Sequence, residues 1–354
     1  MKTLYLITGA AGHVGSALCA ELHARGQRVR ALALPGEDVT FLRQTGAEVL
    51  FGDVTKPATL EPFFDIPEGV SGVLIHCAAV VDIAGGENPA VRAVNVDGTR
   101  NVMEFCLDRH IEKVVYVCSV HAMPPLAAGR VRREVDSYDP APLDGAYARS
   151  KAAAADLVQS MIRDCGLPAV IVLPSGIIGP YCGKGNHLVQ MVKDYCRGAL
   201  PAVIRGGYDF VDVRDVANGI LAAAEKGRVG ESYLLTGHAH TLKEMTAMLA
   251  EITGGRKPGV IPMWMAHLAV PFAEHAAKRK HAKPLFTHYA LRVVLENDRF
   301  SHDKAARELG YSPRDLFDTL EDTVAWLRET GEIPALKSPA RKPKALRTRA
   351  DGRI

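Results

Sequence analysis

Tyr147 and Lys151 lie four residues apart in the segment YARSK, which leads directly into a run of four alanines. In an α-helix, residues at this spacing share one face, so the phenol and the ammonium would be neighbours. A tyrosine pKa of about 10 falls when a cation favours the phenolate, and such a phenol can exchange a proton near neutral pH. The same spacing also arises by chance in structural helices, so other residues must decide between the two interpretations.

A second group of residues follows the apolar run TLYLIT, where the chain continues as GAAGHVG. Glycines at this spacing let the backbone turn tightly and approach a pyrophosphate, whose charge then meets the amino-terminal end of a helix. Between a first strand and a first helix the pattern is a strong indication of a dinucleotide site. The predicted contacts are Gly9, Gly12, His13, Val14 and Gly15.

The elements that must position these residues alternate through the first half of the chain. Apolar runs predict strands over residues 3–8, 27–34, 47–51, 72–78, 113–119 and 168–173. Helical patterns are clear over 14–25, 88–109 and 145–165. Continuous apolar strands separated by helices indicate an α/β fold of the Rossmann type, a doubly wound parallel sheet covered on both faces. Ligands of such sheets bind beyond the carboxyl ends of the strands.

Glycine, proline and longer loops become more frequent after residue 175. We expect a Rossmann domain over 1–176 that also includes 210–228, and a smaller substrate lobe built from 177–209 and 229–330. Residues 331–354 are predicted to form a basic, disordered tail.

The segment 261–290 combines an apolar run with a basic cluster, which a membrane-surface helix would also show. Its internal prolines and short apolar length favour a substrate-lobe helix with a solvated basic face.

Composition narrows the class of protein. Of the 354 residues, 47% are apolar and 23% charged, as in soluble globular proteins. No apolar stretch approaches the ~20 residues that span a bilayer, and no signal peptide is apparent, so we expect a cytoplasmic protein without membrane insertion. The seven cysteines form no C-x-x-C pair, which predicts reduced, mostly buried thiols and no metal site.

The net charge of +3 comes from the end of the chain. Residues 337–354 hold seven Lys or Arg and one Asp, which leaves the other 336 residues at −3. Because this body has no basic stripe, we expect a small-molecule substrate and no nucleic-acid partner.

Further residues follow the predicted strands where a dinucleotide site needs them. Asp53 and Val54 come after the third strand, where a carboxylate can accept the adenine amino group and an aliphatic side chain can pack on its ring. Ala78 and Ala79 come after the fourth, and are small enough for a ribose to lie against the backbone. Ser119 ends the fifth strand, at the edge where chemistry is expected. Each alone also has an ordinary structural explanation, such as a helix cap.

Together these motifs resemble the short-chain dehydrogenase/reductase superfamily in its extended form, from residue 1 to about 330. The resemblance rests on TGAAGHVG, GDV (52–54), HCAA (76–79), NVDGTRNV (95–102), VYVCSV (115–120), YARSK, LPSGIIGP (173–180) and FVDVRDVA (210–217). The subgroup that it most resembles contains reductases related to dihydroflavonol reductase and 3β-hydroxysteroid dehydrogenase. The resemblance favours the catalytic interpretation of YARSK.

The resemblance implies a division of work among the matching residues. Tyr147 would be the general acid toward a carbonyl or the base toward an alcohol, while Lys151 would favour the phenolate and hold the nicotinamide ribose. Ser119 would hydrogen-bond the substrate oxygen. Asn95 matches an asparagine that relays protons through water, with a helix-capping role as the alternative.

Other positions matter for the cofactor and for loop packing. Pro174 and Ile177 would pass close to the nicotinamide. His121 could touch substrate, but a packed loop histidine is favoured, and Asp215 is predicted to cap a helix that begins at Val216.

The end of the second strand bears on the choice between NAD and NADP. It reads Ala33-Leu34, without the acidic residue typical of NAD sites or the arginine typical of NADP sites. Glu37 and Asp38 lie just beyond and would repel an added 2′-phosphate, whereas Arg30 is expected to face away from the site. We therefore expect NAD to be preferred over NADP.

The leading hypothesis is an NAD(P)-dependent oxidoreductase that interconverts a secondary alcohol and a ketone or aldehyde on a small, largely apolar substrate. A nucleotide-sugar epimerase or dehydratase is the alternative. It is weakened because Val120-His121-Ala122 stands where dehydratases carry an acidic pair, and Tyr208 stands where epimerases often carry arginine. A catalytically silent NAD(P)-sensing regulator is disfavoured because the catalytic set is complete. The family also implies a homodimer formed through helices 88–109 and 145–165.

Overall fold

The computed structural model describes residues 2–82, 88–126, 129–182, 186–266 and 299–334, with the single residues 268, 270, 291 and 294. Most of the basic segment predicted over 261–290, and the predicted tail from residue 335 onward, lie outside the described residues.

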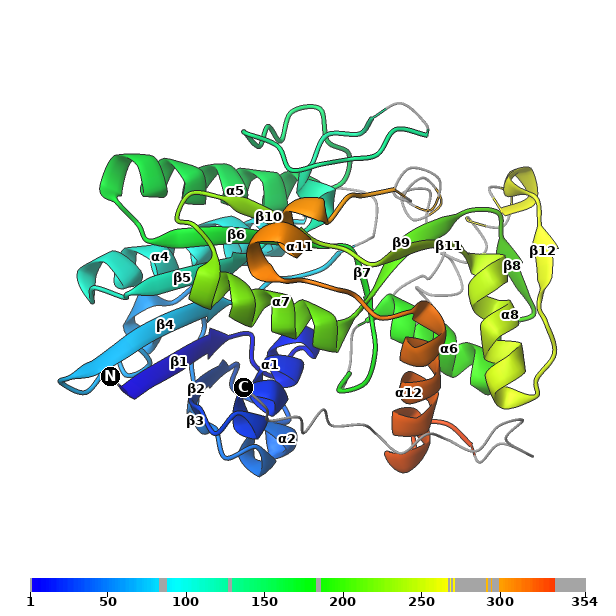
Figure 1. Cartoon of the computed structure of the whole chain (residues 1–354), viewed down its shortest axis with the longest axis horizontal. Coiled ribbons are helices and arrows are strands. Elements are labelled where there is room, and N and C mark those ends of the chain that lie inside the picture. Colours follow the sequence, from blue (N-terminus) through cyan, green and yellow to red (C-terminus); the bar gives the residue numbers. More distant parts are fainter. Residues whose placement is uncertain are drawn as a thin grey trace.

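Seven parallel strands form the central sheet (Figure 1). In sheet order they are β10 (Ser232–Leu235), β6 (Ala169–Pro174), β5 (Lys113–Val117), β4 (Val70–His76), β1 (Lys2–Thr8), β2 (Arg28–Ala33) and β3 (Glu48–Phe51). Strands β2 and β3 follow β1 toward one edge of the sheet, and β5, β6 and β10 follow β4 toward the other edge, so the strand order reverses between β1 and β4. Dinucleotides bind at such a reversal, here between β1 and β4. The predicted Rossmann-type sheet is confirmed, with each of the six predicted strands within two residues of its bounds.

Helices cover both faces of the sheet (Figure 1). On one face lie α1 (His13–Ala24) and α7 (Val213–Lys226), with α11 (Asp303–Leu309) against α7 and β10. On the other lie α4 (Thr99–Asp108) and α5 (Ala146–Cys165). Each face has its own apolar core, because strands covered on both sides bury alternate side chains in opposite directions. The helices predicted over 14–25 and 145–165 are confirmed within one residue.

The helix predicted over 88–109 is not a single α-helix. It begins as α3 (Pro89–Arg92), widens into a π-helical turn over Ala93–Gly98 and continues as α4. Gly98 packs so closely that an added Cβ would lie 2.7 Å from Val54 Cγ2. A π-turn changes which side chains face inward and is frequent at functional sites; Asn95, within this turn, is buried.

Within the described residues, the second lobe contains two small sheets and the three long helices named below, around a separate core, with residues 263–266 also helical. Its strands are β7 (Gly176–Ile178), β9 (Gly207–Asp212) and β11 (His238–Thr241) in one sheet, and β8 (Ala202–Ile204) and β12 (Gly259–Ile261) in the other. Its helices are α6 (His187–Cys196), α8 (Leu242–Thr253) and α12 (Leu316–Glu329). Strand β10 lies within the lobe expected over 229–330, yet it pairs with β6 of the large sheet.

The remaining short elements are α2 (Thr40–Gln44) and the 3₁₀ turns Pro57–Thr59 and Val120–Ala122. Among the described residues, no helix is long and apolar enough to cross a membrane. All seven cysteines are unpaired and four are buried, as the sequence predicts, while Cys165 is exposed.

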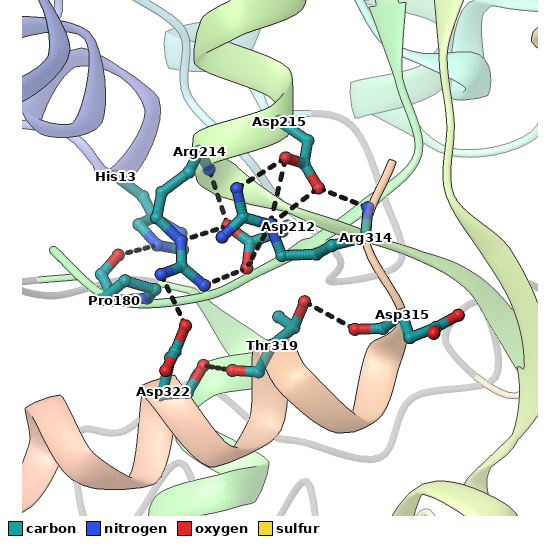
Figure 2. A network of polar contacts seen from close by, with 10 residues as sticks. His13, Pro180, Asp212, Arg214, Asp215, Arg314, Asp315, Thr319 and Asp322 are labelled. Carbon is teal, nitrogen blue, oxygen red and sulfur yellow. Dashed lines mark hydrogen bonds and ion pairs between the residues drawn. The ribbon is translucent and has the colours of Figure 1, made fainter. Parts of the chain in front are cut away.

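A buried ion network connects the first lobe to the second (Figure 2). Asp212 caps α7, and Arg214 donates to its carboxylate through Nε at 2.9 Å and Nη2 at 2.6 Å. Arg214 Nη1 reaches Asp322 Oδ2 of α12 at 2.7 Å. Arg314, just before α12, binds Asp215 at 2.7 Å and lies 3.7 Å from Asp212.

This network corrects the expectation for Asp215. Helix α7 begins at Val213 and is capped by Asp212, so Asp215 lies in its first turn and pairs with Arg314 instead. Burial alone would raise the pKa of Asp212, but the hydrogen bonds and charge of Arg214, with the charge of Arg314, outweigh it and hold this pKa below its ordinary value near 3.8.

Replacing Asp212 with Asn should lower the free energy of unfolding by about 2–3 kcal/mol, because the amide can still cap α7 but leaves two partly buried arginines without their shared anion. Since the pKa of Asp212 is depressed, the difference from the unsubstituted protein should persist down to about pH 4 and vanish only under more acidic conditions. Denaturant titration measures it. The matched control is Asp164→Asn, which breaks the exposed Arg163–Asp164 pair and should cost about 0–0.5 kcal/mol; equal losses would contradict the structural role.

Candidate active site

The glycine-rich turn between β1 and α1 is shaped by close backbone contacts. Gly9 adopts φ +63°, and a Cβ there would lie 2.7 Å from Ala78 Cα. A Cβ at Gly15 would lie 2.4 Å from the carbonyl oxygen of Gly9. Gly12 is the N-cap of α1, and no side chain caps the helix there, so no capping side chain occupies the first backbone N–H groups of α1. The turn therefore fits a pyrophosphate, which needs close backbone approach and a helix amino terminus.

His13, the first residue of α1, is directed toward the second lobe. Its Nε2 lies 2.8 Å from the carbonyl oxygen of Pro180, and its Nδ1 lies 2.9 Å from Asn186 Nδ2. Burial lowers the pKa of His13 to about 4, so the neutral ring donates through Nε2 and accepts at Nδ1. Both ring nitrogens are thus used by protein groups, and a cofactor contact of His13 would come from its backbone. Val14 is half-buried.

Tyr147 and Lys151 occupy the first two turns of α5, at the carboxyl ends of the sheet strands. Lys151 Nζ donates to the carbonyl oxygen of Val117 at 2.7 Å. The Tyr147 ring packs edge-on against His121, with ring centroids 5.8 Å apart. Burial lowers the pKa of His121 to about 4. The histidine is thus a neutral packing partner of the tyrosine.

Ser119 follows β5 and begins the 3₁₀ turn Val120–Ala122. Its Oγ accepts a hydrogen bond from the backbone N–H of His121 at 3.2 Å. As the acceptor of this bond, the hydroxyl keeps its own proton for another partner. The side chain is 6% exposed, which suits a donor aimed at a substrate oxygen.

The Asn95 side chain forms three hydrogen bonds within the protein. Its Oδ1 accepts from Val80 N at 2.7 Å, and its Nδ2 donates to Val80 O at 3.0 Å and to Ser150 Oγ at 2.9 Å. Ser150 Oγ in turn donates to the carbonyl oxygen of Tyr147 at 2.8 Å. The capping role considered for Asn95 is wrong, since Asn88 caps α3. Asn95 instead braces the turn of α5 that carries the tyrosine.

A buried imidazole continues this chain to the glycine-rich turn. Thr99 Oγ1 donates to the backbone oxygen of Asn95 at 2.7 Å and lies 3.0 Å from His76 Nε2. On the other side of the ring, His76 Nδ1 lies 2.7 Å from Thr8 Oγ1, which accepts from Ala78 N at 3.3 Å. Burial lowers the pKa of His76 to about 3. The only consistent pattern for a neutral ring has Nε2 donating to Thr99 and Nδ1 accepting from Thr8.

The residues expected at the adenosine end lie after β3. Asp53 Oδ1 accepts from the backbone and hydroxyl of Thr55, at 2.9 Å and 2.7 Å, and Oδ2 lies 3.8 Å from Lys56. Oδ2 is therefore the oxygen better placed for an adenine amino group. Val54 is 5% exposed and packs on Gly98, so only a small face of it is available to a ring.

The residues expected at the nicotinamide end lie after β4 and β6. Ala78 and Ala79 are half-buried. Pro174 ends β6, and Ile177 lies in β7, where its carbonyl oxygen accepts from Asn186 at 2.9 Å. The roles expected for these residues stay predictions.

Sequence reasoning missed the polar residues behind the site. Thr8, His76, Thr99 and Ser150 form the hydrogen-bonded chain, and each lies in one of the quoted motifs, TGAAGHVG, HCAA, NVDGTRNV and YARSK. The motifs could have signalled these residues, but nothing in the sequence shows that they bond to one another, because their partners lie far apart along the chain.

The chain belongs to the NAD dependent epimerase/dehydratase family, whose model matches residues 5–235. This confirms the resemblance to extended short-chain dehydrogenases/reductases and makes the chain an NAD(P)-dependent enzyme of that class.

Individual relatives match over nearly the whole chain. "Sterol demethylase protein B" of Methylococcus capsulatus is 32% identical over 336 residues, covering 93% of this chain and 99% of the relative. A ketoreductase of Stigmatella aurantiaca that acts on a farnesylated dihydroquinoline oxide is 33% identical, covering 87% and 91%. The crystal structure of gox2253 is 34% identical with a TM-score of 0.80, covering 94% and 99%.

Replacing Ser150 with Ala should leave one of the two amide protons of buried Asn95 without an acceptor, while the bond to Val80 O remains, and lower the unfolding free energy by about 1–3 kcal/mol. Turnover should fall as well, because Asn95 is then no longer connected to the turn of α5 that carries Tyr147. Denaturant titration and steady-state kinetics measure the two effects. Ser160→Ala in the same helix removes only an exposed bond to Arg163 and should change stability by less than about 0.5 kcal/mol. Identical behaviour of the two variants would contradict the bracing role.

Proposed function

We propose that the protein is an NAD(P)-dependent oxidoreductase that interconverts an alcohol and the corresponding carbonyl compound, a secondary alcohol with a ketone or a primary alcohol with an aldehyde. The observation that carries this proposal is the position of Tyr147 and Lys151 in the first turns of α5, beside Ser119 at the end of β5. All three lie at the carboxyl edge of the sheet, where the glycine-rich turn also lies, so a substrate and a nicotinamide would meet there.

The proposed chemistry divides between cofactor and protein. A bound nicotinamide supplies or accepts the hydride. In the reducing direction Tyr147 donates its proton to the substrate oxygen, and the Lys151 ammonium favours the phenolate that remains. Ser119 donates a hydrogen bond to the same oxygen and stabilises the charge that builds there. Asn95 acts as a positioning residue, since its amide protons are used by Val80 and Ser150.

Several residues of the chain support an apolar, cyclic or aromatic substrate. Tyr208, where epimerases often carry arginine, is half-buried and packs edge-on against Phe210 at 5.7 Å. Leu126 is 51% exposed and available to a ligand, whereas Met123, in the same loop, is buried in the core of the α4–α5 face. The names of the two relatives point the same way, since a sterol and a farnesylated quinoline are largely apolar ring systems.

A nucleotide-sugar epimerase or dehydratase is the second candidate function, because the family is named for epimerases and dehydratases. Two measurements separate the candidates. Tightly retained cofactor without net redox turnover would favour the epimerase, as would micromolar binding of UDP- or dTDP-sugars in calorimetry. A silent NAD(P)-sensing regulator is disfavoured by the presence of all three catalytic side chains.

We propose a homodimer, by analogy with the family, that pairs the helices predicted over 88–109 and 145–165, of which α4 and α5 are the described counterparts. We also propose a cytoplasmic location, which the seven unpaired cysteines support.

Replacing Tyr147 with Phe should reduce turnover by about 10²-fold or more, because the ring is kept but the transferable proton is lost. Cofactor affinity should change little. The control is Tyr5→Phe, a hydroxyl whose charged neighbours are Glu225 and Arg25 at the opposite edge of the sheet. Steady-state kinetics with a carbonyl substrate and titration with the nicotinamide give both quantities. Near-normal turnover of Tyr147→Phe would refute the catalytic assignment.

The second strand predicts a modest preference for NAD over NADP. Arg30 is turned away from the site, as expected, since it binds Glu48 at 2.8 Å and the carbonyl oxygen of Asp65 at 2.6 Å. Leu34 is 46% exposed, and its N–H donates to the Glu37 carboxylate at 2.8 Å. This carboxylate, just beyond the end of the second strand, supports the preference because it would repel a 2′-phosphate bound there. Comparison of kcat/KM for NADH and NADPH on one substrate tests this, and a tenfold advantage for NADPH would show that the preference is wrong.

A further inference from the structure

The Lys151 ammonium is a buried cation without a paired anion among the described residues. Lys151 is 3% exposed, and its Nζ donates a hydrogen bond to the neutral carbonyl oxygen of Val117. Burial lowers the pKa of Lys151, and the groups that oppose this effect are the thiols of Cys118 and Cys77. A buried charge is costly unless something compensates it.

The ring of Tyr116 lies against this ammonium. Lys151 Nζ is 5.0 Å from the ring centroid, within the range of a cation–π contact. Tyr116 precedes Val117 in β5, so one residue offers its ring and the next its carbonyl to the same ammonium. The ring of His76 stacks with that of Tyr116 at 5.9 Å and an interplanar angle of 24°.

The hydroxyl of Tyr116 is weakly paired. Among the described residues it is the one buried side-chain nitrogen or oxygen without a partner at hydrogen-bond geometry, and the polar group that interacts with it is the Cys118 thiol, a weak acceptor. The hydroxyls of Tyr147 and Tyr138 are also electrostatic neighbours. Because phenylalanine would avoid burying this weakly paired hydroxyl, the ring rather than the hydroxyl is the part of Tyr116 that serves the ammonium.

We propose that Tyr116 is a positioning residue whose ring face holds the Lys151 ammonium beside Tyr147 and compensates its buried positive charge. The proposal rests on the proposed function, in which this ammonium supports the phenolate. Cation–π attraction is strongest where the cation is desolvated, as it is here. The ring supplies electron density without introducing an anion that would pair with the lysine and cancel its effect on the tyrosine.

The other titratable groups around the ammonium do not supply a negative charge near neutral pH. On and beside β4, burial lowers the pKa of His76 to about 3 and raises that of Cys77 to about 12. On β5, burial also raises the pKa of Cys118. On α5, the Tyr147 hydroxyl is the proposed acid. This leaves the Val117 carbonyl and the Tyr116 ring as the groups that stabilise the cation.

The test compares Tyr116→Phe, which keeps the ring and removes the weakly paired hydroxyl, with Tyr116→Leu, which keeps apolar bulk and removes the ring. The titration of Lys151 is followed by NMR in cofactor-free protein carrying ¹³C at lysine Cε, with the resonance assigned by its loss in Lys151→Met. We expect the midpoint of Tyr116→Phe to match that of the unsubstituted protein. The midpoint of Tyr116→Leu should be lower by about one pH unit.

Two further outcomes are decisive, and one replacement variant keeps the test possible. Equal midpoints in the Phe and Leu variants would overturn the proposal. Should Tyr116→Leu fail to fold, Tyr116→Met replaces it, because methionine adapts to irregular space. Independently of any variant at this position, the Lys151 side-chain protons of the unsubstituted protein should be shifted upfield by the ring face, and unshifted protons would also overturn the proposal.

Failure of the proposed function gives a different result. Normal turnover by Tyr147→Phe would remove the catalytic role of the tyrosine, yet the lysine titration, measured without turnover, would still report the contact with Tyr116. If Tyr147→Phe is inactive while the Phe and Leu variants at Tyr116 titrate alike, the positioning proposal alone is wrong. When both proposals hold, Tyr116→Leu should also lose turnover about tenfold relative to Tyr116→Phe.

Discussion

A neutral, fully buried imidazole joins the two halves of the site. His76 lies between a threonine at the end of β1 and a threonine at the start of α4, and each of its nitrogens has one partner. Through Thr99 the chain reaches Asn95, and through Ser150 it reaches the backbone of Tyr147. The geometry of the glycine-rich turn and that of the tyrosine are therefore set by one continuous set of hydrogen bonds. Protonation of the imidazole would disrupt this set of hydrogen bonds. Nδ1 would become a donor, and the Thr8 hydroxyl, which donates to Nδ1 in the neutral ring, would have to rotate its proton away.

Local sequence patterns were sufficient to predict the elements that carry the site. The glycine spacing and the apolar strands report backbone requirements that act within a few residues, so the turn at Gly9 and the starts of α1 and α5 could be placed closely. The π-turn around Asn95 could not be predicted from local patterns; Gly98 at its end packs against Val54, 44 residues away in the turn after β3. Asp215 was assigned to the wrong role for the same reason: its partner, Arg314, lies 99 residues away.

Two sets of polar contacts among the described residues join the second lobe to the starts of α1 and α7. His13 connects the start of α1 to Pro180 and to the cap of α6. The Asp212 network connects the start of α7 to α12, and Figure 2 shows His13 and Pro180 beside it. Because both attachments begin at helix amino termini near the expected pyrophosphate, the position of the lobe depends on the same turn that would bind the cofactor. The second lobe and the glycine-rich turn are thus fixed relative to each other by these contacts.

Asp212 and Lys151 are both buried charged residues, but Asp212 is paired with opposite charges and Lys151 is not paired with an anion among the described residues. Asp212 is buried with two arginines around it, so its charge is neutralised locally and has little influence at a distance. Lys151 is buried about as deeply, and among the described residues its partners are a carbonyl and a ring face rather than an anion. A buried charge without a paired anion is expensive for folding, and its field is weakly screened. If Tyr147 is the acid we propose, a charge of that kind would favour its phenolate, and the proposed chemistry would account for this cost.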